Sequence, residues 1–232
     1  MMFSPVHNYV FIHIPKSAGS SIRKSLSDID RPPRPLRIWN RLTGRKIAQP
    51  VVEIQSLHTH SDARDVLKSL GTETYGKCFT FAFVRNPWDR IVSLYNHVWQ
   101  GALDRAAGRQ QPKVLTAQEE IENSKRVESL GFRKWLLSEE YQSDKYGQSL
   151  TQRSQLQWLC DDNGQLITQF VGRVESIQDD IRQVERGINA RIHLVHVNKS
   201  RHRDYRDEYC DETRDFVAHH FREDIETFDY TF

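Results

Sequence analysis

The sequence has 232 residues, of which 38% are hydrophobic and 10% aromatic, enough for a compact domain with a buried core. Its 33 Lys and Arg against 31 Asp and Glu give a net charge of +2, which excludes a global field that would draw the chain onto nucleic acid or an anionic membrane. Three cysteines without a CxxC pair exclude a disulfide framework and a cysteine-rich zinc site, and the lack of a signal-peptide pattern or an apolar run of about 18 residues predicts a cytoplasmic protein without a membrane span.

The first half of the chain alternates between strand and helix patterns. Residues 9–14 are a β-rich run that stops at Pro15, and a helical pattern starts near Ser21 after a stretch of small residues. A short helix is predicted over residues 62–70. Residues 79–84 predict a second strand, and the helix after it carries apolar side chains at helical spacing: Trp88, Ile91, Val92, Tyr95 and Trp99.

The second half continues this alternation. Residues 166–171 predict a strand, residues 176–184 a helix with Gly187 just beyond it, and residues 192–195 another strand. A long C-terminal helix is expected from one apolar stripe, made of Phe216, Val217, Phe221, Ile225 and Phe228. Strands that each feed a helix indicate an α/β fold with a mostly parallel, P-loop-like sheet and helices on both faces, in a single domain over residues 1–232.

Two segments interrupt the pattern. Residues 31–50 are expected to form a basic loop, because the stretch 31–46 holds six basic residues and no acid, and its prolines discourage a regular helix. Residues 101–125 are polar and rich in Ala, Gln and Glu, which is typical of a surface insertion with some helix. The basic loop is either a solvated loop or an attraction for an anionic ligand.

A candidate phosphate-binding loop lies directly between the first strand and its helix. Small residues let the backbone approach a ligand, successive N–H groups and the helix N-terminus suit an anion, and Lys16 adds a positive charge. The common NTPase loop is excluded because Lys16 precedes Gly19 instead of following it. An ordinary turn that caps the helix is the alternative. The loop residues are Pro15, Lys16, Ser17, Ala18, Gly19, Ser20 and Ser21.

A second candidate binding segment spans residues 85–95. Arg85 stands at the carboxyl end of the predicted strand, where open α/β sheets bind ligands, and Ser93 lies two helical turns downstream. An arginine and a hydroxyl group together suit a terminal phosphate. The alternative is that Arg85 and Arg90 pair with Asp89 or Asp65.

The loop and the RNPWDRIVSLY segment resemble two motifs of the sulfotransferases that use 3′-phosphoadenosine 5′-phosphosulfate (PAPS). The likeness is to the carbohydrate-type branch, which includes heparan 2-O- and chondroitin 4-O-sulfotransferases and soluble bacterial members. Residues 170–175 and 196–200 are similar to later blocks of that branch, so the resemblance covers residues 9–232. It is weakest in the segments 31–50 and 101–125, which we expect on the acceptor side.

The resemblance implies a role for each matching residue. Lys16 would contact the sulfuryl group and the bridging oxygen, while residues 17–21 hold the 5′-phosphate. Arg85 and Ser93 would bind the 3′-phosphate, which distinguishes PAPS from other adenine nucleotides. A donor-covering loop would be formed by Lys199, Ser200 and Arg201.

A hydroxyl acceptor needs a general base, and His58 and His60 are two candidates. The branch commonly places a histidine here, followed by a small or hydroxyl residue and an alanine before a helix. His60 matches that pattern better than His58, so His60 is the first choice and His58 stays open. No metal is expected, because no third ligand follows the His-x-His pair at metal-site spacing and Lys16 can stabilise the leaving phosphate.

The resemblance thus implies sulfuryl transfer from PAPS to a hydroxyl group of a carbohydrate, with release of adenosine 3′,5′-bisphosphate. The basic loop would suit a carbohydrate that is anionic. The balanced charge and the lack of a recognised nucleic-acid module predict no nucleic-acid partner. Two alternatives remain. A kinase or NTPase with an atypical phosphate loop would need an acidic residue where strand 79–84 is followed by Arg85. A non-catalytic protein that binds a nucleotide or a glycan would leave the His60 imidazole unexplained.

Overall fold

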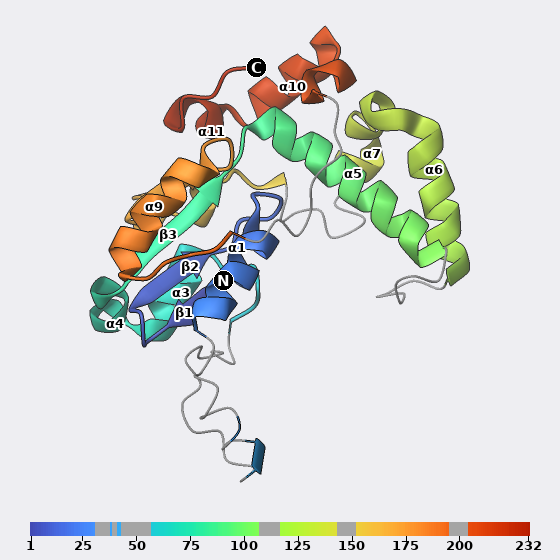
Figure 1. Cartoon of the computed structure of the whole chain (residues 1–232). Helices are drawn as coiled ribbons and strands as arrows, with labels where there is room; N and C mark the ends of the chain where they lie inside the picture. Colours follow the sequence, from blue (N-terminus) through green and yellow to red (C-terminus); the bar gives the residue numbers. More distant parts are fainter. Residues whose placement is uncertain (31–37, 39–40, 43–56, 107–116, 143–151, 195–203) are drawn as a thin grey trace. The chain divides into compact units, whose positions relative to one another are not determined.

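The computed structural model describes residues 1–30, 38, 41–42, 57–106, 117–142, 152–194 and 204–232. The chain divides into two compact units, a first unit of residues 1–85 with 155–199 and a second unit of residues 86–154 with 200–232. The first unit carries a mostly parallel sheet with flanking helices (Figure 1), so the predicted α/β class is confirmed. The boundary of a single domain over residues 1–232 stays a prediction.

A four-stranded sheet in the order β1-β2-β3-β4 forms the frame of the first unit. β2, β3 and β4 run parallel, and β1 pairs antiparallel with β2. The carboxyl ends of the parallel strands therefore meet at one edge, where the chain continues into the Pro15–Ser21 loop, Arg85 and Val174. The strands are β1 (Met2–Ser4), β2 (Tyr9–Ile12), β3 (Phe79–Val84) and β4 (Phe170–Arg173).

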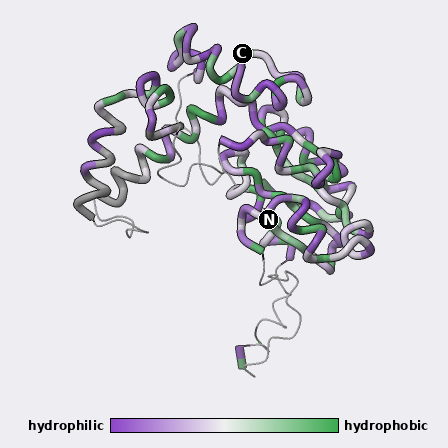
Figure 2. Tube along the Cα trace, turned by 180° about the vertical axis from the view of Figure 1, so that it is seen from behind, coloured by the Kyte–Doolittle hydropathy of each residue, from purple (hydrophilic) through white to green (hydrophobic). Residues whose placement is uncertain are grey.

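Helices cover both faces of this sheet. Phe11, Phe81 and Phe83 belong to one buried cluster with apolar side chains of α1 and α9, because alternate residues of a strand share a face. Figure 1 shows α9 in front of β3 and α3 behind the strands, and in Figure 2 the helices alternate between hydrophilic and hydrophobic residues along their length. The helices of this unit are α1 (Gly19–Ile29), α3 (Ala63–Leu70), α4 (Thr72–Lys77), the 3-10 helix η1 (Leu156–Trp158) and α9 (Ile177–Ile188).

The second unit is built from helices. Its two longest helices are α5 (Pro87–Ala106) and α6 (Ala117–Leu136), and α6 is kinked at Gly131, where φ is 65°. Aromatic rings fill its centre, with the pairs Tyr95–Trp135 and Phe132–Tyr209 at 5.2 and 4.9 Å between centroids. The remaining elements are α7 (Glu139–Gln142), η2 (Tyr205–Glu208), α10 (Asp211–His220) and α11 (Arg222–Thr227).

Several predicted boundaries were wrong. The strand expected over residues 166–171 is β4 at 170–173, and residues 192–194, expected in a strand, have no regular structure. The single C-terminal helix is broken at Phe221 into α10 and α11. The basic loop 31–50 lies outside the described residues except for positions 38, 41 and 42, and the segment 101–125 contributes the end of α5 and the start of α6.

The described part of the chain contains no helix that is both long enough and apolar enough to cross a bilayer. Cys78, Cys160 and Cys210 are all described and all carry free thiols. The prediction that the chain has no disulfide framework is therefore confirmed.

Gly187 was expected to follow a helix, but it lies inside α9. A Cβ atom at this position would come within 2.6 Å of three atoms of the Phe79 ring, at the start of β3. Glycine thus allows α9 to approach the sheet closely. Glycine destabilises a helix relative to alanine, but at this position the close packing against Phe79 leaves no room for a side chain.

We predict that Gly187→Ala lowers the free energy of unfolding by about 1–3 kcal/mol, because the added methyl group overpacks the contact with Phe79. Gly76→Ala in α4 is the matched control, since a Cβ there meets no atom within 4 Å. Helix propensity should make that control neutral or more stable by up to about 1 kcal/mol. Urea unfolding followed by circular dichroism measures both, and equal effects of the two variants would contradict the packing argument.

Candidate functional site

The loop between β2 and α1 has an unusual backbone. Lys16 and Ala18 adopt left-handed conformations, with φ of 67° and 56°, which non-glycine residues rarely do. Ala18 precedes the first residue of α1, and its carbonyl accepts the N–H groups of Ser21 and Ile22. The N–H groups of Gly19 and Ser20 therefore have no acceptor within the helix, which is the arrangement that binds anions.

Gly19 is required at the start of α1 because the His13 ring occupies the space of a side chain. A Cβ atom on Gly19 would lie 1.7 Å from Cδ2 and 1.9 Å from Nε2 of His13. His13 is buried, and its Nδ1 has no hydrogen-bond partner among the described residues. Burial is the main cause that lowers the pKa of His13 to about 2, and repulsion from His60, when that ring is protonated, adds to it, so the His13 ring is neutral.

Lys16 and Arg85 bring two positive charges to the carboxyl edge of the sheet. Nη1 of Arg85 donates a hydrogen bond of 3.3 Å to the Lys16 carbonyl, and both side chains are half-buried. Burial, and then repulsion from Arg85, lowers the pKa of Lys16 to about 8. An anion bound beside the two cations would relieve this repulsion, so the loop and Arg85 fit a phosphorylated ligand.

Gln155 links the loop to Arg85. Its side chain is completely buried, and its Oε1 accepts hydrogen bonds from Oγ of Ser17 at 3.0 Å and from the N–H of Arg85 at 2.9 Å. Its Nε2 donates to the Arg85 carbonyl at 2.8 Å. Gln155 could not be found from the sequence, because no local pattern marks a glutamine whose partners are 138 and 70 residues away.

His60 is oriented by the backbone of His13. Nδ1 of His60 lies 3.2 Å from the His13 carbonyl oxygen, and because a carbonyl can only accept, Nδ1 must carry the hydrogen. The neutral ring then has its lone pair on Nε2, which is the state a general base needs. Burial lowers the pKa of His60 below its usual 6.5 against the opposing hydrogen bond to His13. Repulsion from the Met1 amino group, when that group is protonated, and from Arg23 adds to the decrease.

His58 and the nearby acidic residue have different surroundings. His58 is exposed, and its backbone closes a turn with Ser61 through hydrogen bonds of 2.9 and 3.1 Å. Asp62 is buried as the N-cap of α3, where it accepts from the N–H of Asp65 and pairs with Arg64 at 3.0 Å. Asp62 is thus occupied by structural contacts, and His60 has the geometry closest to that of a base.

The remaining predicted residues stay predictions. Ser93 is half-buried on α5 in the second unit, whereas Arg85 is the last residue of the first segment of the first unit. Their joint binding of one phosphate stays a prediction. Lys199, Ser200 and Arg201 lie outside the described residues.

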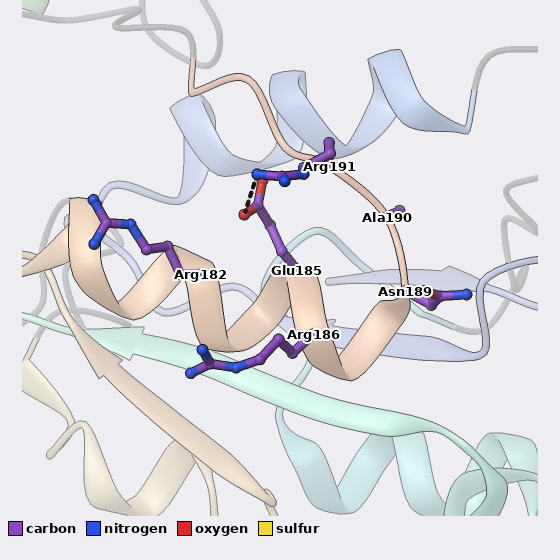
Figure 3. A pocket seen from close by; sticks show the side chains of 6 residues that line it. All are labelled: Arg182, Glu185, Arg186, Asn189, Ala190 and Arg191. Carbon is purple, nitrogen blue, oxygen red and sulfur yellow. Dashed lines mark ion pairs between the residues drawn. The ribbon is translucent and has the colours of Figure 1, made fainter.

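An open cavity of about 440 Å³ lies elsewhere, along the last turns of α9 (Figure 3). Gly187 packs there against Phe79, the first residue of β3, so this cavity is at the amino edge of the sheet and not at the loop. Arg191 forms an ion pair with Glu185 at 4.0 Å across it. The lining contains no predicted site residue and consists of Arg182, Glu185, Arg186, Asn189, Ala190 and Arg191.

Comparison with known families identifies the chain over almost its full length. A family model described as "Sulfotransferase family" matches residues 1–231, and the chain therefore belongs to the sulfotransferase family. No curated protein and no solved structure shows significant similarity to it. Membership confirms the predicted family and supports sulfuryl transfer as the general reaction.

Proposed function

We propose that this member of the sulfotransferase family transfers the sulfuryl group of PAPS to a hydroxyl group of an anionic carbohydrate and releases adenosine 3′,5′-bisphosphate. The observation that carries the proposal is that one edge of the sheet brings together an anion-binding loop with Lys16 and a His60 imidazole whose Nε2 can accept a proton. The likeness of the two motifs to the PAPS-dependent, carbohydrate-type branch supports both the donor and the acceptor class.

The residues present fit the donor. Ser17 has partners for both its N–H and its hydroxyl group, at Ile14 and Gln155, so we assign the 5′-phosphate to Lys16 and to the N–H groups of Gly19 and Ser20. Arg85 has a planar guanidinium that suits the 3′-phosphate. Nothing in this assignment requires a metal ion.

In the proposed reaction the acceptor oxygen attacks sulfur, and a new S–O bond forms as the bond to the bridging oxygen breaks. The electron pair of the broken bond stays on the 5′-phosphate, and the charged Lys16 stabilises this developing charge. Nε2 of His60 takes the proton of the acceptor hydroxyl group, while the His13 carbonyl holds Nδ1–H and so stabilises the imidazolium that forms.

Arg23 supports an anionic acceptor. Its Nη1 donates to Oγ1 of Thr59, the neighbour of His60, at 3.5 Å, and its Nε is buried without a hydrogen-bond partner among the described residues. Among the residues that the structure describes, no carboxylate forms an ion pair with Arg23. A half-buried guanidinium beside the proposed base is suited to a carboxylate or sulfate group of the acceptor.

We predict that adenosine 3′,5′-bisphosphate raises the melting temperature much more than ADP or AMP does. A ligand that binds only the folded state stabilises it by mass action, by about 2.7 kcal/mol at a hundredfold excess over its Kd. The selectivity is expected because Arg85 adds a second phosphate subsite to the loop. Thermal unfolding at matched nucleotide concentrations measures it, and equal shifts for the three nucleotides would remove the donor assignment.

His60→Ala is expected to lower kcat by about 10²- to 10⁴-fold, because it removes the proposed base, and His58→Ala should have a milder effect. Lys16→Ala should cost on the order of 10²-fold or more, since it removes a charge that acts mainly in the transition state. Rates measured at saturating PAPS test all three variants, with circular dichroism to check folding. A folded and fully active Lys16→Ala enzyme would refute its role, and the reverse order of the two histidines would move the base to His58.

The pH profile of kcat/KM for PAPS should be bell-shaped. Activity requires neutral His60, whose pKa lies below 6.5, so the acid limb should fall below pH 6.5 as the ring gains a proton. It also requires charged Lys16, whose pKa is about 8, so activity should decline as the pH rises through about 8. In Lys16→Arg the alkaline decline should disappear, because a guanidinium stays protonated. An acid limb above pH 6.5 would argue against His60.

Arg23→Gln should weaken the use of acceptors that carry carboxylates. We expect KM for a uronic-acid-containing polysaccharide to rise about tenfold, and KM for the same polymer after carboxyl reduction to change little. Lys24→Gln is the matched control, since Lys24 is the exposed cation next in the helix. An equal effect of Arg23→Gln on both polymers would contradict a contact with the acceptor charge.

A further inference from the structure

Three hydrogen bonds of the Gln155 side chain converge on the proposed donor site. Both lone pairs of its Oε1 are used, one by the Ser17 hydroxyl group and one by the Arg85 N–H. Its Nε2 donates a hydrogen bond of 2.8 Å to the carbonyl oxygen of Arg85. The amide therefore holds both main-chain groups of Arg85 and, at the same time, one side chain of the loop.

Only an amide of this length can make this set of contacts. A glutamate has the same shape and can still accept from Ser17 and Arg85, but it would place a carboxylate oxygen against the Arg85 carbonyl. A methionine fills a similar volume and makes none of the three bonds. Because the side chain is completely buried, water does not readily replace a lost partner, so a broken bond at this position is costly.

We infer that Gln155 is a positioning residue that fixes the distance between the two phosphate subsites, and so makes the protein select nucleotides with phosphates at both the 5′ and 3′ positions. The inference rests on the proposed function, which places the 5′-phosphate at the loop and the 3′-phosphate at Arg85. Gln155 is bonded to Ser17, which lies in the loop that carries the first subsite, and to Arg85 in the second subsite.

The physical basis is preorganisation. A nucleotide with two phosphates gains from the second contact only when both subsites already stand at the separation of its phosphates. The bond from Nη1 of Arg85 to the Lys16 carbonyl, at 3.3 Å, is a second and longer link between the same two places. Loss of the Gln155 hydrogen bonds should therefore lower the affinity for the bisphosphate more than the affinity for a nucleotide with one phosphate.

The test is calorimetric titration of the full chain with three nucleotides: adenosine 3′,5′-bisphosphate, adenosine 5′-phosphate and adenosine 3′-phosphate. For Gln155→Met and Gln155→Glu we expect Kd for the bisphosphate to rise by about tenfold or more, and Kd for each monophosphate by less than about threefold. Gln183→Met, an exposed glutamine on α9, is the matched control and should leave all three constants unchanged. Thermal unfolding reports the stability of each variant separately.

The outcomes are distinct. If Gln155 had a purely structural role, its substitution would raise Kd for all three nucleotides by the same factor. That result, or unchanged Kd values, would overturn the inference. Should Gln155→Met fail to fold, Ser17→Ala makes the same comparison, because it removes one of the three bonds from the loop side, with an expected change of about threefold. If the wild-type protein binds the bisphosphate no more tightly than the monophosphates, the proposed donor is refuted, and the inference falls with it. This comparison needs no variant.

Discussion

The close packing of Gly19 against the ring of His13 is the contact on which the rest of the site depends. It holds the first turn of α1 directly over the end of β2, so the Pro15–Ser21 loop has to turn sharply through the left-handed residues Lys16 and Ala18. The same residue, His13, offers its carbonyl to Nδ1 of His60. The contact between Gly19 and His13 thus shapes the loop in which an anion can bind. The carbonyl of His13 also determines that Nε2 of the His60 imidazole is the nitrogen that can accept a proton.

The electrostatic character of the site follows from the burial of its titratable groups. Desolvation keeps His13 and His60 uncharged and brings Lys16 close to its titration range, and the charges that act on Lys16 and on the two imidazoles are positive. Burial of these groups is costly in the unliganded protein, and a bound anion would offset part of that cost. A region selected for binding at the expense of stability would have this character.

Local patterns in the sequence predicted the parts of the fold that depend on neighbouring residues. The strand 79–84 and the helix after it were found from their periodicity, and Asp62 caps α3 where that helix was expected to begin. The prediction for Gly187 was wrong. Glycine is required there because of the Phe79 ring, 108 positions earlier in the chain, and not because a helix ends. Within the site the loop and Arg85 were identified from motifs, whereas Gln155 was not recognised, since its role arises from contacts that only the folded chain creates.

The first unit is discontinuous, and this has a consequence for the order in which the chain acquires its structure. Residues 1–85 contain the loop, His60 and Arg85, but β4 and Gln155 follow only after the 69 residues that separate Arg85 from Gln155. During synthesis the early segment can form β2, α1 and β3, but it lacks the neighbouring strand and the amide that hold Arg85. Closing this long loop costs entropy that is recovered only when β4 docks, so the binding edge is completed late in folding. If the proposed function holds, the nascent chain would be unable to bind the nucleotide at both phosphate subsites until more than half of its length has been made.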